Sequence, residues 1–311
     1  MRKKHSRSSD RKKDLAFHLI LLAWPVVQFL VFYVFVNINS ILLAFNYGPE
    51  ANPNGGVFYW FEQCFAAQPD GSRPYLEAMG ISFILYICST LISLPLALLF
   101  AYYISRRFAG SKFFRFILFL PSILSATVMI IIFKYFNNLE ILYFLHEFFP
   151  DNVVDILTTT ETSTYVTIVL FDAFINFGTT TLIYSNRMSE IPNEIFEAAE
   201  LDGVSHAREF FQISLPLSFP TFSTFIVTGL ATIFVNQYSL FTFYGSNLNG
   251  LSPGPIGYVI YNNVQDAAVQ GNYGAPAFHQ MAALGLVCTF ITIPLVFGVK
   301  YLLERFGPKE E

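Results

Sequence analysis

The sequence predicts an all-α integral membrane protein with six transmembrane helices, and three observations support this. Of the 311 residues, 54% are hydrophobic and 13% are charged, whereas about a quarter of the residues of a soluble domain are charged. The apolar residues gather into stretches that reach the roughly 20 residues needed to cross a bilayer. The basic residues fall almost entirely on one side when these stretches alternate across the membrane.

The expected spans cover most of the chain. Five stretches contain no Asp, Glu, Lys or Arg, and a sixth, residues 165–185, is interrupted only by Asp172. The membrane domain therefore extends over residues 15–303, between a basic tail at 1–14 and a short tail at 304–311. The charge-free stretches are 15–45, 78–104, 116–133, 210–265 and 267–299. The expected helices lie near 15–45, 77–104, 114–135, 163–186, 218–244 and 277–303.

The orientation follows from the basic residues. Of the 18 Lys and Arg residues, all but Arg73 and Lys134 fall on the same side of the six-span arrangement. Because positive charge is retained on the cytoplasmic side, both termini are predicted to be cytoplasmic.

A cleavable signal peptide is the alternative for the N-terminus, since it also begins with a basic stretch and an apolar run. The run from Leu15 is longer than a usual signal core and lacks a clear small-x-small cleavage site, so we interpret it as the first span. Cys88 and Cys288 fall in expected spans and Cys64 in an external segment. This placement indicates neither a disulfide framework nor a CxxC metal site.

The segment 190–216, between the fourth and fifth spans, predicts two short cytoplasmic helices with a break between them. Pro192 suits the first turn of a helix, Gly203 can end that helix in a left-handed conformation, and Ser205 can cap the second. Acidic residues outnumber Arg187 and Arg208, which disfavours a helical hairpin on anionic lipid and favours docking onto a protein. The acidic residues are Glu190, Glu194, Glu197, Glu200, Asp202 and Glu209.

The same segment resembles the EAA motif of permease subunits of bacterial ABC importers, most closely those of the carbohydrate-uptake branch. The resemblance implies that Glu197, Ala198, Ala199, Asp202 and Gly203 belong to a coupling helix that contacts the ATPase. Val204 departs from the alanine usual after the glycine. The matching residues are Glu197-Ala198-Ala199, Asp202-Gly203, Phe210, Ile213, Leu215-Pro216 and Pro220, and Asn247 to Pro255 loosely resembles a Gly-Gly-Pro loop of sugar permeases.

The resemblance also implies the partners. The sequence contains no G-x-x-x-x-G-K-[ST] phosphate-binding loop, so ATP is handled by another subunit. Two copies of an ATP-binding subunit, a second homologous permease and an extracytoplasmic solute-binding protein are expected, in a bacterial inner (cytoplasmic) membrane. We expect no catalytic site, metal, cofactor or nucleic-acid partner.

Polar residues at membrane depth mark a candidate path for a sugar or similar polar solute. These are Asn176 in the fourth span and Asn236, Gln237 and Tyr238 in the fifth, although polar groups in spans also hold helices together. Asp172 supports an alternative function, a secondary transporter that relays protons through this carboxylate. Inverted repeats, which such transporters often carry, are not evident. A non-transporting membrane scaffold would explain the spans but not the motif.

Overall fold

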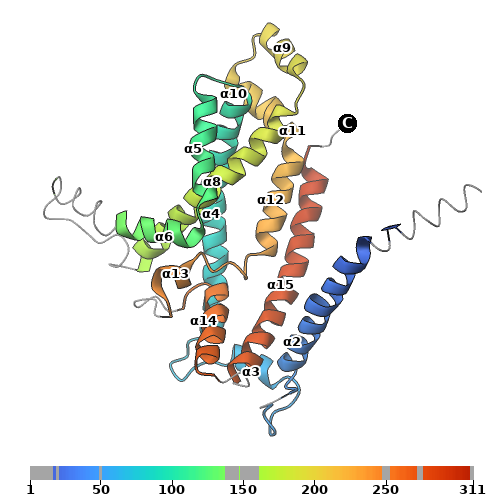
Figure 1. Cartoon of the computed structure of the whole chain (residues 1–311), viewed down its shortest axis with the longest axis vertical. Helices are drawn as coiled ribbons and strands as arrows, with labels where there is room; N and C mark the ends of the chain where they lie inside the picture. Colours follow the sequence, from blue (N-terminus) through green and yellow to red (C-terminus); the bar gives the residue numbers. More distant parts are fainter. Residues whose placement is uncertain are drawn as a thin grey trace, which may run out of the picture. The chain divides into compact units, whose positions relative to one another are not determined.

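The computed structural model describes residues 17–18, 21–48, 51–136, 147, 161–246, 253–271 and 276–308. Within these ranges the regular elements are all helices (Figure 1). The prediction of an all-α chain is confirmed for this part. The whole tail 1–14 and residues 247–252 of the loop that resembles a Gly-Gly-Pro loop lie outside the described residues.

The chain forms two compact units. The first contains residues 1–66 and 267–287, and the second contains residues 67–266 and 288–311. The candidate residues of the motif and of the solute path all belong to the second unit.

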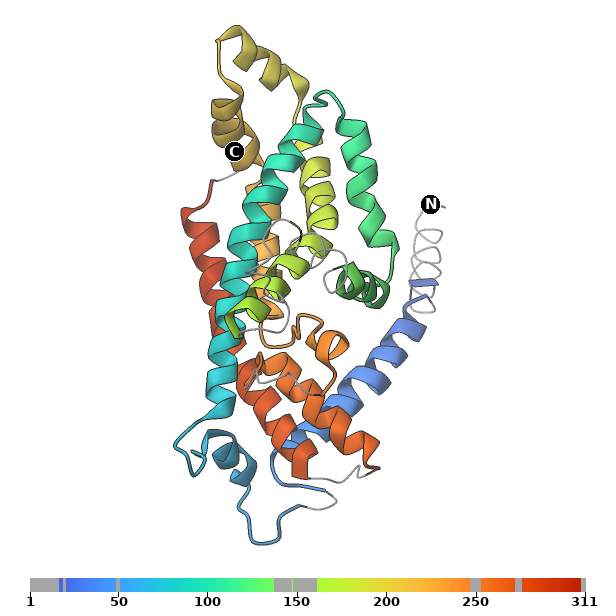
Figure 2. The same cartoon turned by 90° about the vertical axis from the view of Figure 1, so that its left-hand side faces the viewer.

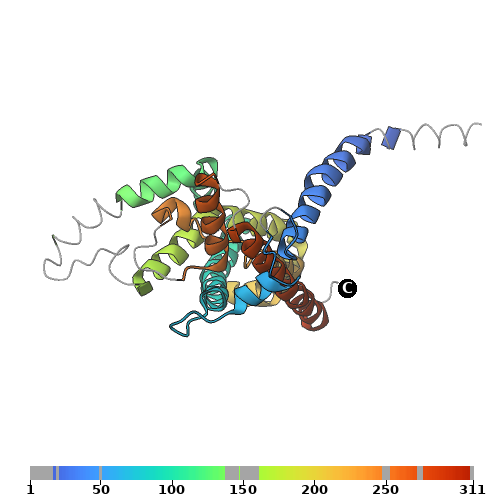
Figure 3. The same cartoon turned by 90° about the horizontal axis from the view of Figure 1, so that it is seen from below.

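Four of the expected spans are found as single long, apolar helices. Among the described residues they are Leu21–Ala44, Pro74–Ser105 (α4), Thr164–Ser189 within α8 (Glu161–Ser189) and Pro276–Phe306 (α15). The first includes η1 (Phe29–Phe35), a π-helical segment, and α2 (Val36–Ala44). Figure 3 shows η1 and α2, in blue, as one continuous helical rod.

The span expected near 114–135 is broken. Helix α5 (Ser111–Ile123) is followed by α6 (Ala126–Tyr135), and the two are bent by 97°. Pro121 has no backbone N–H, so one hydrogen bond of the helix cannot form there. Ser125 then starts α6, because its hydroxyl accepts the N–H of Val128 at 3.3 Å. The expectation of one continuous helix here is wrong.

The span expected near 218–244 is also interrupted. Helix α12 (Phe219–Ala231) ends before residues 232–239, which form turns, and α13 (Leu240–Tyr244) follows. Thr232 Oγ1 donates to the carbonyl oxygens of Thr228 at 3.2 Å and Gly229 at 3.1 Å. Such side-chain bonds compete with the backbone ladder and favour helix ends. Tyr238 and Ser239 then adopt left-handed φ angles of 51° and 58°, which turn the chain into α13.

Helices α4, α5 and α8 lie side by side within the second unit (Figure 2). Ala97 and Ala101 of α4 are fully buried beside Tyr184 and Met188 of α8. Small residues at such positions let helix backbones approach closely in a membrane. Ser82 of α4 holds the start of α14 (Ile256–Val269), since its hydroxyl accepts the N–H of Ile256 at 2.8 Å.

In the first unit, Asn46 organises the turns that precede α3 (Tyr59–Phe65). Its amide nitrogen donates to the carbonyls of Asn52 and Gly55, both at 3.0 Å, and its amide oxygen accepts from Trp60 Nε1 at 3.0 Å. The Trp60 ring stacks on His279, with centroids 5.5 Å apart. The buried side chains thus fix a segment that composition alone describes as turns around aromatic residues.

Candidate functional site

The segment after α8 folds into short helices, as expected. They are α9 (Asn193–Leu201), α10 (His206–Glu209), η3 (Phe210–Ser214) and α11 (Leu215–Leu217). Figure 1 places α9 and α10 at one end of the second unit. The prediction of helix, break and helix is therefore confirmed, although Pro192 lies at the N-cap of α9 instead of within its first turn.

The break between α9 and α10 depends on Gly203. Its φ is +70°, the left-handed conformation predicted from the sequence, and a Cβ added here would meet no atom within 4 Å. Backbone strain, and not crowding, therefore favours glycine at this position. Ser205 caps α10 as expected, because its hydroxyl accepts the N–H of Arg208 at 3.4 Å.

The five residues singled out by the motif do not share one environment. Glu197, Ala198, Asp202 and Gly203 are exposed, whereas Ala199 is 7% exposed and packs inside the chain. Leu201, the last residue of α9, is 90% exposed. Leu201 was not among the residues predicted from the motif, although an apolar side chain at the end of an acidic helix indicates a contact surface.

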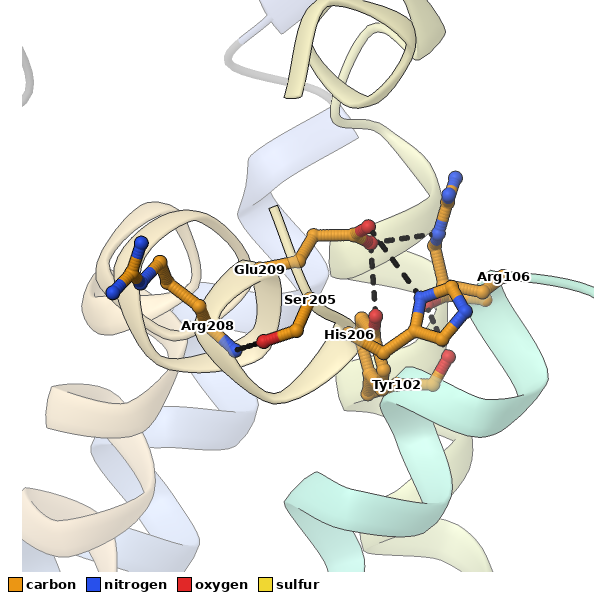
Figure 4. Close-up of polar contacts among 7 residues, drawn as sticks. Tyr102, Arg106, Ser205, His206, Arg208 and Glu209 are labelled. Atoms are coloured by element: carbon orange, nitrogen blue, oxygen red, sulfur yellow. Dashed lines mark hydrogen bonds and ion pairs between the residues drawn. The ribbon is translucent and has the colours of Figure 1, made fainter. Parts of the chain in front are cut away.

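A buried carboxylate holds this segment to α4. Glu209 is 3% exposed. Its Oε1 accepts the Tyr102 hydroxyl at 2.9 Å and forms an ion pair with Arg106 Nε at 2.7 Å (Figure 4). His206 Nδ1 lies 3.8 Å from Oε2 of the same carboxylate. Arg208, on the same helix, points away from this cluster (Figure 4).

The Arg106 side chain also contacts α9. Its guanidinium carbon lies 4.3 Å from the centroid of the Phe196 ring, an arrangement in which the cation is attracted to the π face. Phe196 is 4% exposed. In the sequence, Arg106 is one of the basic residues that set the orientation and Glu209 is one of six acidic residues, so their contact was not predicted.

The polar residues of the fifth expected span lie in the break after α12. Asn236 is exposed, and its Oδ1 accepts the N–H of Tyr238 at 2.8 Å. Tyr238 is 4% exposed in a core cluster with Leu85 and Ile168. Gln237 Oε1 is buried and has no hydrogen-bond partner among the described residues. Of the three residues, Asn236 is therefore exposed at the break, whereas Gln237 Oε1 and the Tyr238 side chain are buried.

Asp172 and Asn176 of α8 contact each other. Asn176 is exposed and donates to Asp172 Oδ1 at 3.1 Å and to its carbonyl oxygen at 3.0 Å. Asp172 Oδ2 accepts the hydroxyl of Ser89, in α4, at 3.0 Å. This carboxylate thus joins α4 to α8, and its bonds satisfy part of its need for donors at membrane depth.

Comparison with known families decides the class of protein. The profile described as "Binding-protein-dependent transport system inner membrane component" matches residues 68–311. The chain belongs to this family. It is a multi-pass permease component of an ABC transport system and not an enzyme.

Individual relatives agree. The chain is 27% identical over 220 residues to the probable ABC transporter permease protein YesP of Bacillus subtilis, which covers 70% of this chain and 69% of that protein. It is 24% identical over 217 residues to the multiple sugar-binding transport system permease protein MsmF of Streptococcus mutans, which covers 68% and 73%. A chain of a bacterial alginate ABC transporter, solved in complex with an alginate pentasaccharide-bound periplasmic protein, has the same fold, with a TM-score of 0.79, 18% identity and 96% of each chain covered.

Family membership separates the functions considered from the sequence. It supports the permease and gives no support to a secondary transporter that relays protons through Asp172. It also accounts for the motif, which a membrane scaffold would not require. The contacts of Asp172 with Ser89 and Asn176 are consistent with a structural role between α4 and α8.

Proposed function

We propose that the chain is one permease subunit of a bacterial importer that carries a sugar or oligosaccharide across the inner membrane. In this proposal the chain crosses the membrane six times, with α5 and α6 counted as one span and α12 and α13 as another, and both termini are cytoplasmic. The relatives named for sugar transport support the substrate class. The proposal is carried by the exposed end of α9, an acidic helix of a membrane protein that the described residues of the chain leave uncovered.

The segment 190–216 couples the permease to an ATPase. Glu197, Ala198, Asp202 and Gly203 provide the contact surface because they are exposed, and Ala199 provides the packing that holds α9 in place. Leu201 adds an apolar group at the end of this surface. Acidic groups around one apolar side chain suit a partner groove with a basic rim and an apolar floor.

The solute path runs beside the break at residues 232–239. Transporter sites are often built where a spanning helix is interrupted, because the freed backbone groups can face a polar solute there. Asn236 and Gln237 supply amide groups at the break, and Asn176 supplies another from α8. Amides both donate and accept, as sugar hydroxyls do. Tyr238 supports the path indirectly, because its buried ring holds the turn in place.

The partners follow from this arrangement. We propose a complex with two copies of an ATP-binding subunit on the cytoplasmic side, a second homologous permease in the membrane and an extracytoplasmic solute-binding protein. The family description and the alginate transporter solved with its periplasmic protein support the last of these.

Reconstitution tests the proposal. The permease, its sister permease, the ATPase and the binding protein are placed in liposomes, and uptake of labelled maltooligosaccharides and galactooligosaccharides is measured with and without ATP. Saturable uptake that requires both ATP and the binding protein is expected. Uptake driven by a proton gradient without ATP would overturn the proposal.

A variant tests whether Asn236 belongs to the proposed solute path. Asn236→Ala removes an exposed amide at the break and is expected to raise the KM for uptake about tenfold, the equivalent of about 1.4 kcal/mol, with unchanged basal ATP hydrolysis. Asn54→Ala, at an exposed position of the first unit, is the matched control. An unchanged KM in Asn236→Ala would remove this residue from the path.

A further inference from the structure

We propose that Arg106 and Glu209 form a positioning pair that fixes the coupling segment to the end of α4, so that movement of this segment displaces α4 together with α12. This inference rests on the proposed coupling function. The pair lies on the inner side of the segment, away from the exposed face of α9 proposed to contact the ATPase.

The burial of Glu209 requires an explanation. Its side chain is 4% exposed although it belongs to a polar connecting segment. Tyr102, in the last turn of α4, donates its hydroxyl to the carboxylate at 2.9 Å, and Arg106, directly after α4, forms an ion pair with it at 2.7 Å. Desolvating a carboxylate is costly unless opposite charge and hydrogen bonds compensate. The buried carboxylate therefore depends on these partners, which ties the position of α10 to the end of α4.

Arg106 contacts both halves of the segment. Its guanidinium lies over Phe196 in α9, and its Nε pairs with Glu209 in α10. Between these helices lies Gly203, which does not by itself fix one angle because glycine has a wide range of backbone conformations. Arg106, directly after α4, thus contacts both helices and sets the angle between α9 and α10.

Backbone connections and the Arg106–Glu209 pair together define how movement of the coupling segment reaches the membrane helices. Backbone continuity joins the segment to α8 before it and to α12 after it, but α4 is distant in sequence. Its contact with the segment includes the pair and the rings of Tyr102 and Phe210, whose centroids are 5.4 Å apart. Directly after α4, Phe108 adds a contact with His206 at 5.2 Å between centroids. A push on α9 therefore reaches α4 through Arg106.

The first test concerns the permease alone. Trypsin cleaves after arginine, and Arg208 is exposed in α10. Arg106→Met is expected to accelerate cleavage after Arg208 at least fivefold, because the segment is no longer held. The matched control is Arg107→Met, which removes an exposed neighbouring charge and should leave the rate unchanged. Equal rates for Arg106→Met and the wild type would overturn the proposal.

The second test concerns transmission in the assembled complex. Arg106→Met combined with Glu209→Gln removes both charges, so that neither remains buried alone. ATP hydrolysis is expected to stay near the wild-type rate while the number of solute molecules imported per ATP falls at least fivefold. A wild-type import ratio in this variant would overturn the proposal, since the pair would then serve stability only.

If the double variant does not assemble, a conservative change provides another test. Arg106→Lys keeps the charge but lacks the flat guanidinium that lies over Phe196 and the Nε that reaches Glu209. A reduced import ratio in Arg106→Lys supports the proposal, and an unchanged ratio overturns it. A wild-type complex without ATP-dependent import would contradict the proposed function itself, whereas normal wild-type import with unchanged ratios in the variants contradicts only the role of the pair.

Discussion

Gly178 of α8 faces the backbone carbonyl oxygen of Leu118 in α5 so closely that a Cβ on Gly178 would overlap it. Helices α5 and α8 can therefore pack at this distance only with glycine at position 178. Backbone atoms cannot move aside as a flexible side chain can, so any larger residue must separate the two helices.

We predict that Gly178→Ala destabilises the permease by about 1–3 kcal/mol, the usual cost of inserting a methyl group into a packed site. The measurement is the melting temperature of the purified protein in detergent. Gly80→Ala in α4 is the control, because a Cβ there meets no atom within 4 Å, and it should leave the melting temperature unchanged or slightly higher. Equal melting temperatures for both variants would contradict the close approach of α5 and α8.

A second prediction concerns the thiol of Cys64. The residue is 3% exposed, its Sγ lies 3.6 Å from the carbonyl oxygen of Gln280, and burial raises the pKa of the thiol to about 12. Because the thiolate is the reactive form, we expect maleimide to leave Cys64 unmodified at pH 7.5 in the folded protein. An exposed cysteine introduced as Asn54→Cys should react within minutes, and comparable rates at the two positions would contradict the burial of Cys64.

The same pKa shift predicts how stability depends on pH. An unfolded thiol ionises above about pH 8.5, whereas the folded thiol keeps its proton until about pH 12. Between these values the folded state binds more protons, so stability falls as pH rises through this window. Cys64→Ala removes the effect, and its melting temperature should decline less than that of the wild type between pH 8.5 and 10.

A third prediction tests the six-span arrangement. All but Arg73 and Lys134 of the 18 basic residues lie on one side of it, which places position 54 outside the cell and position 207 inside. A maleimide that cannot cross the membrane should therefore label Asn54→Cys and spare Ala207→Cys in intact cells, and both positions are exposed in the structure. Labelling of position 207 from outside would reverse the orientation.

The long spans were predictable because length and hydropathy alone define a helix in a bilayer. Helices α4, α8 and α15 begin and end within a few residues of the expected bounds. The breaks at 124–125 and 232–239 were not, since serine, threonine and proline also occur inside unbroken membrane helices. Their effect depends on bonds such as that from Thr232 to Thr228.

The candidate site was predictable only in part. Gly203 and Ser205 act locally, through a left-handed backbone and a helix cap, and such local roles can be predicted from sequence. The role of Glu209 is not local, because its partner Tyr102 lies 107 residues away. Sequence alone could not separate this buried acid from exposed ones such as Glu197, since both belong to the same acidic segment.

The last prediction concerns the angle between α9 and α10. Gly203→Val places a β-branched residue at a φ of +70°, a conformation that costs such residues about 1–3 kcal/mol. Gly203→Asn is the matched control, since asparagine tolerates the left-handed region much better than other residues. Both variants add a side chain of similar size at the same position, so they differ mainly in backbone preference. We expect Gly203→Val to reduce solute import severalfold while the assembled complex continues to hydrolyse ATP, and Gly203→Asn to import near the wild-type rate. The measurements are uptake, ATP hydrolysis and co-purification of the ATPase for each variant. Normal import by Gly203→Val with a fully assembled ATPase would mean that the segment tolerates any angle, and its role in coupling would have to be abandoned.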